Sequence, residues 1–249
     1  MAQLFGLIPA AGSGSRMGGT LPKQYHALAG KPLLGHAVER LCAHRSIEQV
    51  FVVLAPGDAH FAGCDWRACG DRVKPLYCGG HTRAASVFNG LLAIRDLVHA
   101  ADWMLVHDAA RPCLPAGALG RLIGEIRSEE TGGLLALPVV DTLKRADRDG
   151  YVVGTEPREQ IWQAQTPQMF RYRILVEALR LADLADATDE ARAVEKIGCK
   201  AKLVMGDSRN LKVTYPEDLD LAALILGNLR REEDADEPAA AEGTLQAHP

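Results

Sequence analysis

A glycine-rich loop that carries two cations stands near the start of the chain. It reads PAAGSGSRMG over residues 9–18, an apolar run over residues 4–8 precedes it, and Pro22 and Lys23 follow. Glycines let backbone N–H groups turn toward an anion with no Cβ in the way. Arg16 and Lys23 add full positive charge to these dipoles. The pattern predicts a loop that follows a buried strand and cradles a triphosphate.

Two familiar phosphate-binding loops fit this stretch poorly. A P-loop requires Gly-x-x-x-x-Gly-Lys-Ser/Thr, and no such string follows Gly12 or Gly14. A dinucleotide-binding loop requires Gly-x-Gly-x-x-Gly, and here Gly18 comes one residue late. The acidic residue expected at the end of a second strand is also displaced, to Asp58. An NAD-binding oxidoreductase is therefore the weaker alternative.

A second group of chemically active residues ends a predicted strand, with the sequence VHDAARP over residues 106–112. The carboxylate of Asp108 is well placed there to help hold Mg²⁺, which prefers one or two carboxylates together with phosphate oxygens. On these residues alone, a helix cap or a bond to Arg111 is the favoured explanation of Asp108. For His107, packing at the strand end is favoured over a role as general base. The other histidines show no metal-binding spacing, so zinc is not expected.

Three further segments could reach the same site. Gly79 and Gly80 precede a predicted helix that carries Ser86, which would let a base or ribose approach the backbone; an ordinary strand-to-helix turn is the alternative. Residues 210–214 are predicted as a late short strand that could bring Lys212 to the site as a third cation, although on its own Lys212 is better explained as an exposed lysine. Thr188 and Asp189 open a helix, and capping is sufficient to explain both.

The elements that position these residues alternate along the chain. Apolar runs predict strands at 4–8, 50–54, 73–77, 103–107, 134–140, 161–165 and 201–205. Helical spacing predicts helices at 33–43, 84–98, 119–126, 172–184 and 217–229. This alternation predicts an α/β fold with a Rossmann-like, mostly parallel sheet and helices on both faces. Ligands bind beyond the carboxyl ends of such strands, so the three loops should converge on one cleft.

One polar segment interrupts this pattern. Residues 141–155 contain few apolar side chains, and Asp149 and Gly150 form a hairpin turn signal. We expect a projecting β-arm over about residues 139–160. Because an isolated hairpin is marginal in water, the arm is predicted to pack on a second subunit. The main domain then covers residues 1–230, and an acidic tail, residues 231–249, is predicted to be disordered.

Composition limits the class of protein. A chain of 249 residues with 47% hydrophobic and 24% charged residues fits one large α/β domain or two small ones. The net charge of −4 argues against a nucleic-acid partner. No signal peptide and no apolar run long enough for a membrane span are recognised. The six cysteines form no Cys-x-x-Cys pair, so reduced, mostly buried thiols in a cytoplasmic protein are expected.

Taken together, the motifs resemble those of a known family. They are the loop over residues 9–18 with 22–24, residues 79–87, 107–112, 141–144, 165–168, 188–191 and 212–219. In this order, they resemble the 2-C-methyl-D-erythritol 4-phosphate cytidylyltransferases of the non-mevalonate isoprenoid pathway. The resemblance spans about residues 3–229. It implies that the protein joins CTP and methylerythritol phosphate, with release of pyrophosphate.

The resemblance also implies roles for single residues. Arg16, Lys23 and Lys212 would surround the triphosphate. Asp108 would lie near a Mg²⁺ ion that the phosphates mainly hold. The residues that it implies for CTP binding are Ala10, Ala11, Gly12, Gly14, Gly80 and Ser86. Thr166 would lie near the methylerythritol phosphate, which Thr142 and Arg158 from the other subunit of a homodimer would hold. His81 departs from the family, which often carries an acidic residue there.

The implied reaction needs no protein base, because a phosphate monoester is already largely a dianion at neutral pH. Direct in-line attack is expected, with cations and Mg²⁺ supplying positioning and charge stabilisation. Two alternatives remain open at this point. One is a cytidylyltransferase for a pentitol 5-phosphate, such as ribitol 5-phosphate. The other is a nucleotide-binding regulator without catalysis, which the three cations and Asp108 argue against.

Overall fold

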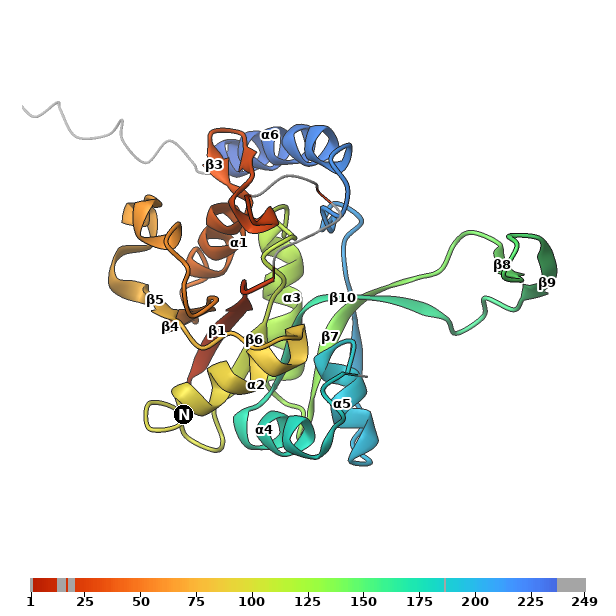
Figure 1. The fold of residues 1–249 in the computed structure, drawn as a ribbon, viewed down its shortest axis with the longest axis horizontal. Helices are drawn as coiled ribbons and strands as arrows, with labels where there is room; N and C mark the ends of the chain where they lie inside the picture. Colours follow the sequence, from red (N-terminus) through yellow and green to blue (C-terminus); the bar gives the residue numbers. More distant parts are fainter. Residues whose placement is uncertain (1, 13–16, 18–20, 186, 237–249) are drawn as a thin grey trace, which may run out of the picture.

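A seven-stranded sheet forms the centre of the molecule (Figure 1), in a computed structural model that describes residues 2–12, 17, 21–185 and 187–236. The strand order is β11-β7-β10-β6-β1-β4-β5. These strands are β1 (Leu4–Pro9), β4 (Gln49–Val53), β5 (Val73–Leu76), β6 (Trp103–Val106), β7 (Gly132–Pro138), β10 (Trp162–Arg171) and β11 (Lys202–Met205). The predicted α/β fold and its mostly parallel sheet are confirmed.

One strand of the sheet runs against the others. The pairs β1–β4, β1–β6, β4–β5 and β7–β11 are parallel, whereas β10 is antiparallel to both β6 and β7. The predicted strand over residues 161–165 covers only the first part of β10, because Pro167 marks a strand edge or a break in a sequence pattern. The pairing of β10 with β7 does shift register there, between Ala164 and Gln168.

Helices cover both faces of the sheet. One apolar cluster packs α1 and α3 against the sheet, and a second packs α2, α4 and α5 against its other face. The helices are α1 (Leu33–Cys42), α2 (Arg83–Ala93), α3 (Ala116–Ile126), α4 (Tyr172–Leu181), α5 (Glu190–Lys196) and α6 (Asp218–Asp236). A third cluster joins α6 to Leu28 of the short β2 (Ala27–Leu28), to Leu33 and to Val213. The β2 strand pairs with β3 (Lys31–Pro32), after the short 3-10 helix η2 (Lys23–Tyr25).

Two sequence predictions about these elements are wrong. Residues 210–214 form no strand: Val213 N–H donates to Ala110 in the loop after β6, and Thr214 N–H donates to the Asp218 carboxylate. The boundary of the acidic tail at residue 230 falls too early, because α6 continues to Asp236. Ion pairs of Glu232 with Arg209 and of Glu233 with Arg40 hold the added turns. Residues 237–249 lie outside the described residues.

A two-stranded hairpin projects from the domain (Figure 1). It consists of β8 (Leu143–Ala146) and β9 (Val152–Glu156), antiparallel to each other. Gly150 in the connecting turn has a φ of 86°, a left-handed value that glycine adopts without strain. Val140, Tyr151 and Val152 are more than half exposed on it. The predicted role of this arm in dimerisation stays a prediction.

Two further properties concern the chain as a whole. None of the helices in the described part of the chain combines the length and the apolar composition that crossing a bilayer requires. All six cysteines are free thiols, of which Cys42, Cys69 and Cys113 are buried. The remaining three thiols are partly buried, so the prediction of mostly buried thiols holds only in part.

Candidate active site

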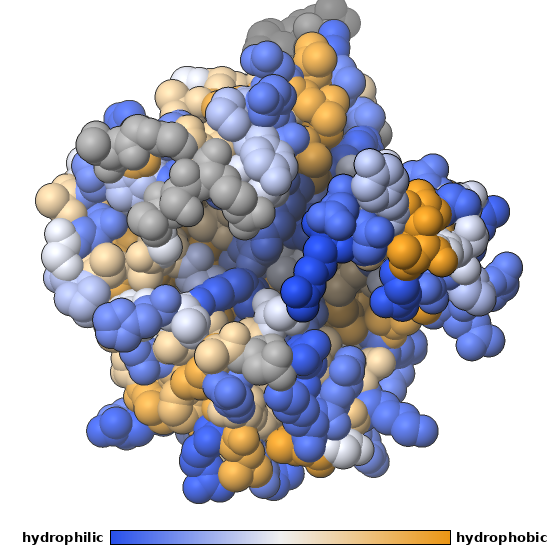
Figure 2. Space-filling model, turned by 45° about the vertical axis from the view of Figure 1, so that its right-hand side comes forward, coloured by the Kyte–Doolittle hydropathy of each residue, from blue (hydrophilic) through white to orange (hydrophobic). Residues whose placement is uncertain are grey.

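A polar hollow opens on the face beside the hairpin arm (Figure 2). Two adjoining cavities lie at the carboxyl end of β1 and β6, and they share Arg83, Asp108 and Lys212. The loop cavity, about 260 Å³, is lined by Pro9, Ala10, Gly12, Lys23, Gln24, Arg83, Asp108, Ala109, Ala110 and Lys212. The network cavity, about 200 Å³, is lined by Arg83, Asp108, Arg111, Ala164, Gln165, Thr166, Gln168, Thr188, Asp189 and Lys212.

Gln24 holds the backbone of the glycine loop in place at the wall of the loop cavity. Its side-chain amide donates to the Ala10 carbonyl at 2.6 Å, while Ala10 N–H donates to Val53 at the end of β4. Lys23 Nζ donates to the Val213 carbonyl, which ties the predicted cation to the segment that carries Lys212. Ala11 is half-buried and Gly12 is exposed. Gly14 and Arg16, the other predicted residues of this loop, lie outside the described residues.

The turn of Gly79 and Gly80 packs directly against the glycine loop. A Cβ on Gly79 would lie 2.2 Å from the Cβ of Ala11 and 2.8 Å from the Leu54 carbonyl oxygen, so only glycine fits. Gly80 N–H donates to Ser86 Oγ at 3.0 Å, and Ser86 donates in turn to the Thr82 carbonyl. Ser86 is therefore buried and shapes this turn, and neither it nor Gly80 lines the two cavities.

Asp108 stands where the two cavities meet. Its Oδ1 accepts from Arg83 Nε at 2.8 Å, and its Oδ2 lies 2.7 Å from Lys212 Nζ. Burial acts to raise the pKa of Asp108, but Arg83, Lys212 and Arg111 outweigh it and hold this pKa well below its usual range. The carboxylate therefore stays ionised. The lysine that the sequence offered as a third cation does reach the cleft, through Asp108.

Arg83 connects Asp108 to a second buried carboxylate. Two of its guanidinium nitrogens donate to the two oxygens of Glu190, at 2.6 and 3.1 Å, in the fork geometry that arginine favours. Glu190 is 1% exposed, and burial raises its pKa despite Arg83. It begins α5, where Asp189 caps the helix by accepting from Arg192 N–H, as predicted. Sequence reasoning missed Glu190 as a site residue.

Arg111, like Arg83, is a further residue that sequence reasoning missed. One of its terminal nitrogens donates to the Asn210 carbonyl at 2.6 Å, while its Nε is buried and has no hydrogen-bond partner among the described residues. Burial lowers its pKa, and Asp108 lies 3.9 Å from Nε. A buried donor without an acceptor is costly, so this wall of the network cavity is suited to an anion. Arg111 could have been recognised from the sequence, because it stands in the motif over residues 107–112 that also contains Asp108.

His107 and Thr166 form the floor beside Asp108. His107 is fully buried, and burial lowers its pKa to about 4, so the ring is neutral at neutral pH. With its Nε2 on the Arg111 carbonyl, its Nδ1 accepts from the Thr166 hydroxyl, which itself accepts from Asp108 N–H. The prediction of a packed histidine is confirmed. Thr166 also lines the network cavity.

The remaining predicted site residues lie elsewhere. Thr142 and Arg158 are exposed on either side of the hairpin strands, and neither lines the two cavities. Arg158 donates to the Val140 carbonyl on the opposite side of the arm. His81 is exposed before α2. Within this chain, Thr142 and Arg158 therefore lie apart from the cleft, and their predicted role in the cleft of a second subunit stays a prediction.

The cleft offers few ligands for a metal ion. No three His, Cys, Asp or Glu side chains of the described residues group in a way that could hold one. Both oxygens of Asp108 already carry a cation. The residues present therefore fit Mg²⁺ only as a single carboxylate beside oxygens that a bound triphosphate supplies, which is the arrangement that Mg²⁺ commonly adopts.

A mostly parallel sheet with a glycine loop after its first strand and cations around the strand ends defines a nucleotide-binding α/β protein. The sequence model of the 2-C-methyl-D-erythritol 4-phosphate cytidylyltransferases matches residues 4–228. The chain belongs to this family, and the resemblance seen in its motifs is confirmed.

Relatives of this name cover nearly the whole chain. The protein from Nitrosospira multiformis is 55% identical over 232 residues, which are 92% of this chain and 100% of the relative. The protein from Azoarcus sp. is 56% identical over 224 residues, which are 90% of this chain and 94% of the relative.

Solved structures agree with the sequence relatives. A crystal structure of a 4-diphosphocytidyl-2C-methyl-D-erythritol synthase is similar with a TM-score of 0.81 and 39% identity, covering 91% of this chain and 99% of the other. The cytidylyltransferase of Francisella tularensis has a TM-score of 0.77 and 32% identity, covering 90% of this chain and 100% of that one.

Proposed function

We propose that the protein transfers a cytidylyl group from CTP to 2-C-methyl-D-erythritol 4-phosphate in isoprenoid precursor synthesis. The products are 4-diphosphocytidyl-2-C-methyl-D-erythritol and pyrophosphate. The observation that carries the proposal is the position of Asp108 with Arg83, Lys212 and Arg111 at the junction of the two cavities. Family membership supplies the identity of the substrates.

The reaction joins two polyanions. A phosphate oxygen of the sugar phosphate attacks the α-phosphorus of CTP, a new P–O bond forms, and the bond to the β-phosphate breaks with its electron pair leaving on pyrophosphate. The attacking phosphate needs no base, because its second pKa is about 6. His107, neutral and enclosed, offers none. The work of the protein is positioning and charge stabilisation.

The loop cavity is suited to CTP. Pro9, Ala10 and Gly12 line it after β1, Ala109 and Ala110 line it after β6, and the cations Lys23 and Lys212 face the same space. Gly14 and Arg16 belong to the same loop in the sequence and complete the proposed triphosphate site. Ala10 and Ala11 present the loop backbone, while Ser86 acts through Gly80, whose N–H it holds.

The network cavity is suited to the sugar phosphate. The unpartnered Nε of Arg111 can donate to a phosphate oxygen, and Thr166 can accept a hydrogen bond from a substrate hydroxyl. Thr142 and Arg158 complete this site from the arm of a second subunit in a homodimer. Their exposed position and their separation from the cleft of their own chain support this arrangement.

Mg²⁺ is proposed as the cofactor, with Asp108 as its protein ligand next to phosphate oxygens. When bound, the ion neutralises charge on the triphosphate. Asp108 would hold the ion beside phosphate oxygens, and Lys212, now 2.7 Å from Asp108, would be available to a phosphate oxygen. Activity should depend on a divalent cation; full turnover in excess chelator would remove the metal from the proposal.

The test is a pyrophosphate-release assay with CTP and a panel of sugar-alcohol phosphates. Methylerythritol phosphate should give the highest kcat/KM, and ribitol 5-phosphate should give little product. The reverse preference would replace the proposed substrate with a pentitol phosphate. No release with any member of the panel would favour a nucleotide-binding regulator without catalysis.

A further inference from the structure

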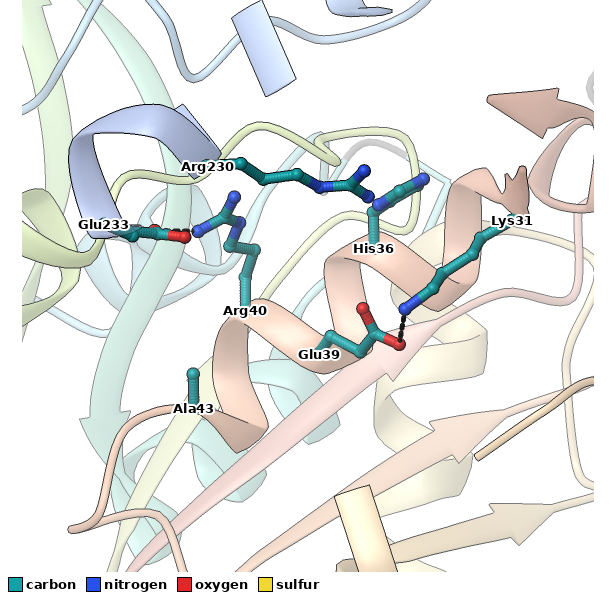
Figure 3. A pocket seen from close by; sticks show the side chains of 7 residues that line it. All are labelled: Lys31, His36, Glu39, Arg40, Ala43, Arg230 and Glu233. Atoms are coloured by element: carbon teal, nitrogen blue, oxygen red, sulfur yellow. Dashed lines mark hydrogen bonds and ion pairs between the residues drawn. The ribbon is translucent and has the colours of Figure 1, made fainter. Parts of the chain in front are cut away.

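A second polar cavity lies outside the cleft, between α1 and α6 (Figure 3). Its volume is about 390 Å³, and it shares no lining residue with the two cavities of the active site. Its lining consists of Lys31, His36, Glu39, Arg40, Ala43, Arg230 and Glu233. Apart from Ala43, every one of these side chains is polar, so the cavity is unsuited to an apolar ligand.

The charges of this cavity are unequally matched. Lys31 is paired with Glu39 at 2.6 Å, and Arg40 is paired with Glu233. The side chain of Arg230 forms no hydrogen bond or ion pair with another residue of the described part of the chain, and Figure 3 shows its guanidinium reaching from α6 toward His36. Three cations thus face two carboxylates, in a protein of net charge −4.

Arg40 supplies further unused donors. Its side chain is only 14% exposed, and one terminal nitrogen serves Glu233. The other N–H groups of Arg40 form no hydrogen bond with the described residues, and the guanidinium lines the same cavity as that of Arg230. The two guanidinium groups come from different helices and line one cavity, and each presents N–H donors that suit the oxygens of a tetrahedral anion.

His36 adds a donor that depends on its protonation. The residue is 3% exposed, and its Nε2 lies 2.7 Å from the Leu28 carbonyl oxygen, to which it donates. Burial lowers the pKa of His36, and Arg230 lowers it further despite the bond to Leu28. In the neutral ring, Nδ1 is an acceptor. An anion in the cavity would favour the imidazolium, in which Nδ1 carries a proton and donates.

We propose that the α1–α6 cavity is a second anion site that binds the doubly charged, tetrahedral oxyanion of a phosphate group, between Arg230 and Arg40. Lys31 contributes long-range charge at its edge. The two carboxylates do not fill the site, because each is already paired with its own cation.

A bound anion would connect two parts of the fold. Arg230 belongs to α6 and Arg40 to α1, and both helices pack on the apolar cluster that contains Leu28, Leu33 and Val213. The Val213 carbonyl accepts from Lys23 of the active site. An anion bound at the second site would therefore stabilise the packing on which Val213 and the loop cavity depend. Because a ligand that binds only the folded state stabilises it, the anion should raise the melting temperature of the protein.

Sulfate is the suitable first probe, because its charge stays at −2 from pH 6 to pH 8. We would follow the imidazole signals of the full chain by NMR during a titration, after assigning His36 with a His36→Asn variant. The matched pair of variants is Arg230→Gln and Arg231→Gln. Arg231 is the next residue of α6 and exposed, it bonds to Asn228, and it does not line the cavity.

The expected result is a saturable shift of His36, tighter binding at pH 6 than at pH 8, and a higher pKa of His36 in the complex. Arg230→Gln should weaken binding about tenfold or more, as expected for one charge-assisted hydrogen bond, and Arg231→Gln should not. If Arg230→Gln alters the circular dichroism spectrum, Lys31→Gln replaces it. Inorganic phosphate and pyrophosphate, titrated next, distinguish a monophosphate from a diphosphate ligand.

Three results would overturn the proposal. One is a His36 signal that does not respond to sulfate or phosphate at tens of millimolar. Another is an equal loss of affinity in Arg230→Gln and Arg231→Gln, because it would indicate general charge screening. The third is unchanged affinity in Arg230→Gln. Turnover of this variant without added anion should equal that of the wild type, which separates the second site from the active site.

Discussion

The two cavities of the cleft are built from different parts of the chain. Six of the residues that line the loop cavity come from the two short segments after β1 and β6, and Lys23, Gln24, Arg83 and Lys212 complete the lining. The network cavity is walled by side chains from the α2 start, the β10 bulge and the α5 start. The loop cavity is proposed for CTP and the network cavity for the sugar phosphate. Substitutions in the two cavities should therefore differ in their kinetic effects.

The largest expected effect is that of Lys23→Ala, which tests the role of the loop cavity. We expect kcat to fall about 10²–10³-fold, the loss found when one preorganised transition-state donor is removed. The KM for the sugar phosphate should change little. Steady-state kinetics with both substrates measures this, and Lys200→Ala, at an exposed lysine, is the control. A near-normal kcat would exclude Lys23 from the mechanism. Arg16→Ala is expected to act in the same way.

Asp108→Asn tests the wall that both cavities share. The amide removes the charge that holds Lys212 and Arg83, so kcat should fall up to about 10²-fold, with KM rising for both substrates. Folding should be retained, as circular dichroism would show. A change confined to one substrate would contradict a shared wall, and normal turnover would leave Asp108 a structural role only.

Arg158→Ala tests whether the network cavity is completed by a second subunit. The KM for the sugar phosphate should rise about tenfold or more, with CTP binding nearly unchanged, because one charge-assisted contact is lost. Arg145→Ala, an exposed arginine of the same arm paired with Glu156, is the control.

The decisive version mixes Arg158→Ala chains with Lys23→Ala chains by co-expression. A heterodimer regains one site in which both residues are wild type, so activity should exceed that of either parent. Purified heterodimers without such a gain would contradict a site shared between subunits.

The two cavities also differ in how far the sequence predicted them. The sequence predicted the loop that lines the loop cavity, because its glycines and cations stand in compact motifs. It predicted the sheet because the apolar runs of the strands are continuous. The network cavity was found only at Asp108, Thr166 and Lys212. The pairing of Arg83 with Glu190 joins residues 107 positions apart, which no local spacing reports. The error at residues 210–214 has a similar cause, because a strand needs a partner that its own sequence does not contain.

The smallest expected effect, and the one that separates positioning from structure, is that of Glu190→Gln. Glu190 touches no reacting atom in the proposed reaction; it holds Arg83, which holds Asp108. Glutamine keeps the volume and removes the charge, so kcat should fall about tenfold, and Glu190→Asp should recover part of it.

Titration of Glu190 should change the stability of the fold and the turnover of the enzyme in opposite directions. Burial raises the pKa of Glu190, so this group takes up its proton at a higher pH than an exposed glutamate does. As the pH falls through this pKa, the protonated carboxyl favours the folded state, and its contribution to the free energy of unfolding increases; as the pH rises, that contribution is lost. Turnover should instead fall as the pH falls, because neutral Glu190 no longer holds Arg83.

Wild-type kcat should therefore show an acid limb from Glu190 in addition to that of the substrate phosphate, whose second pKa is about 6. Only the substrate limb should remain in Glu190→Gln. An identical pH profile in both proteins, together with a normal kcat, would limit Glu190 to packing at the start of α5.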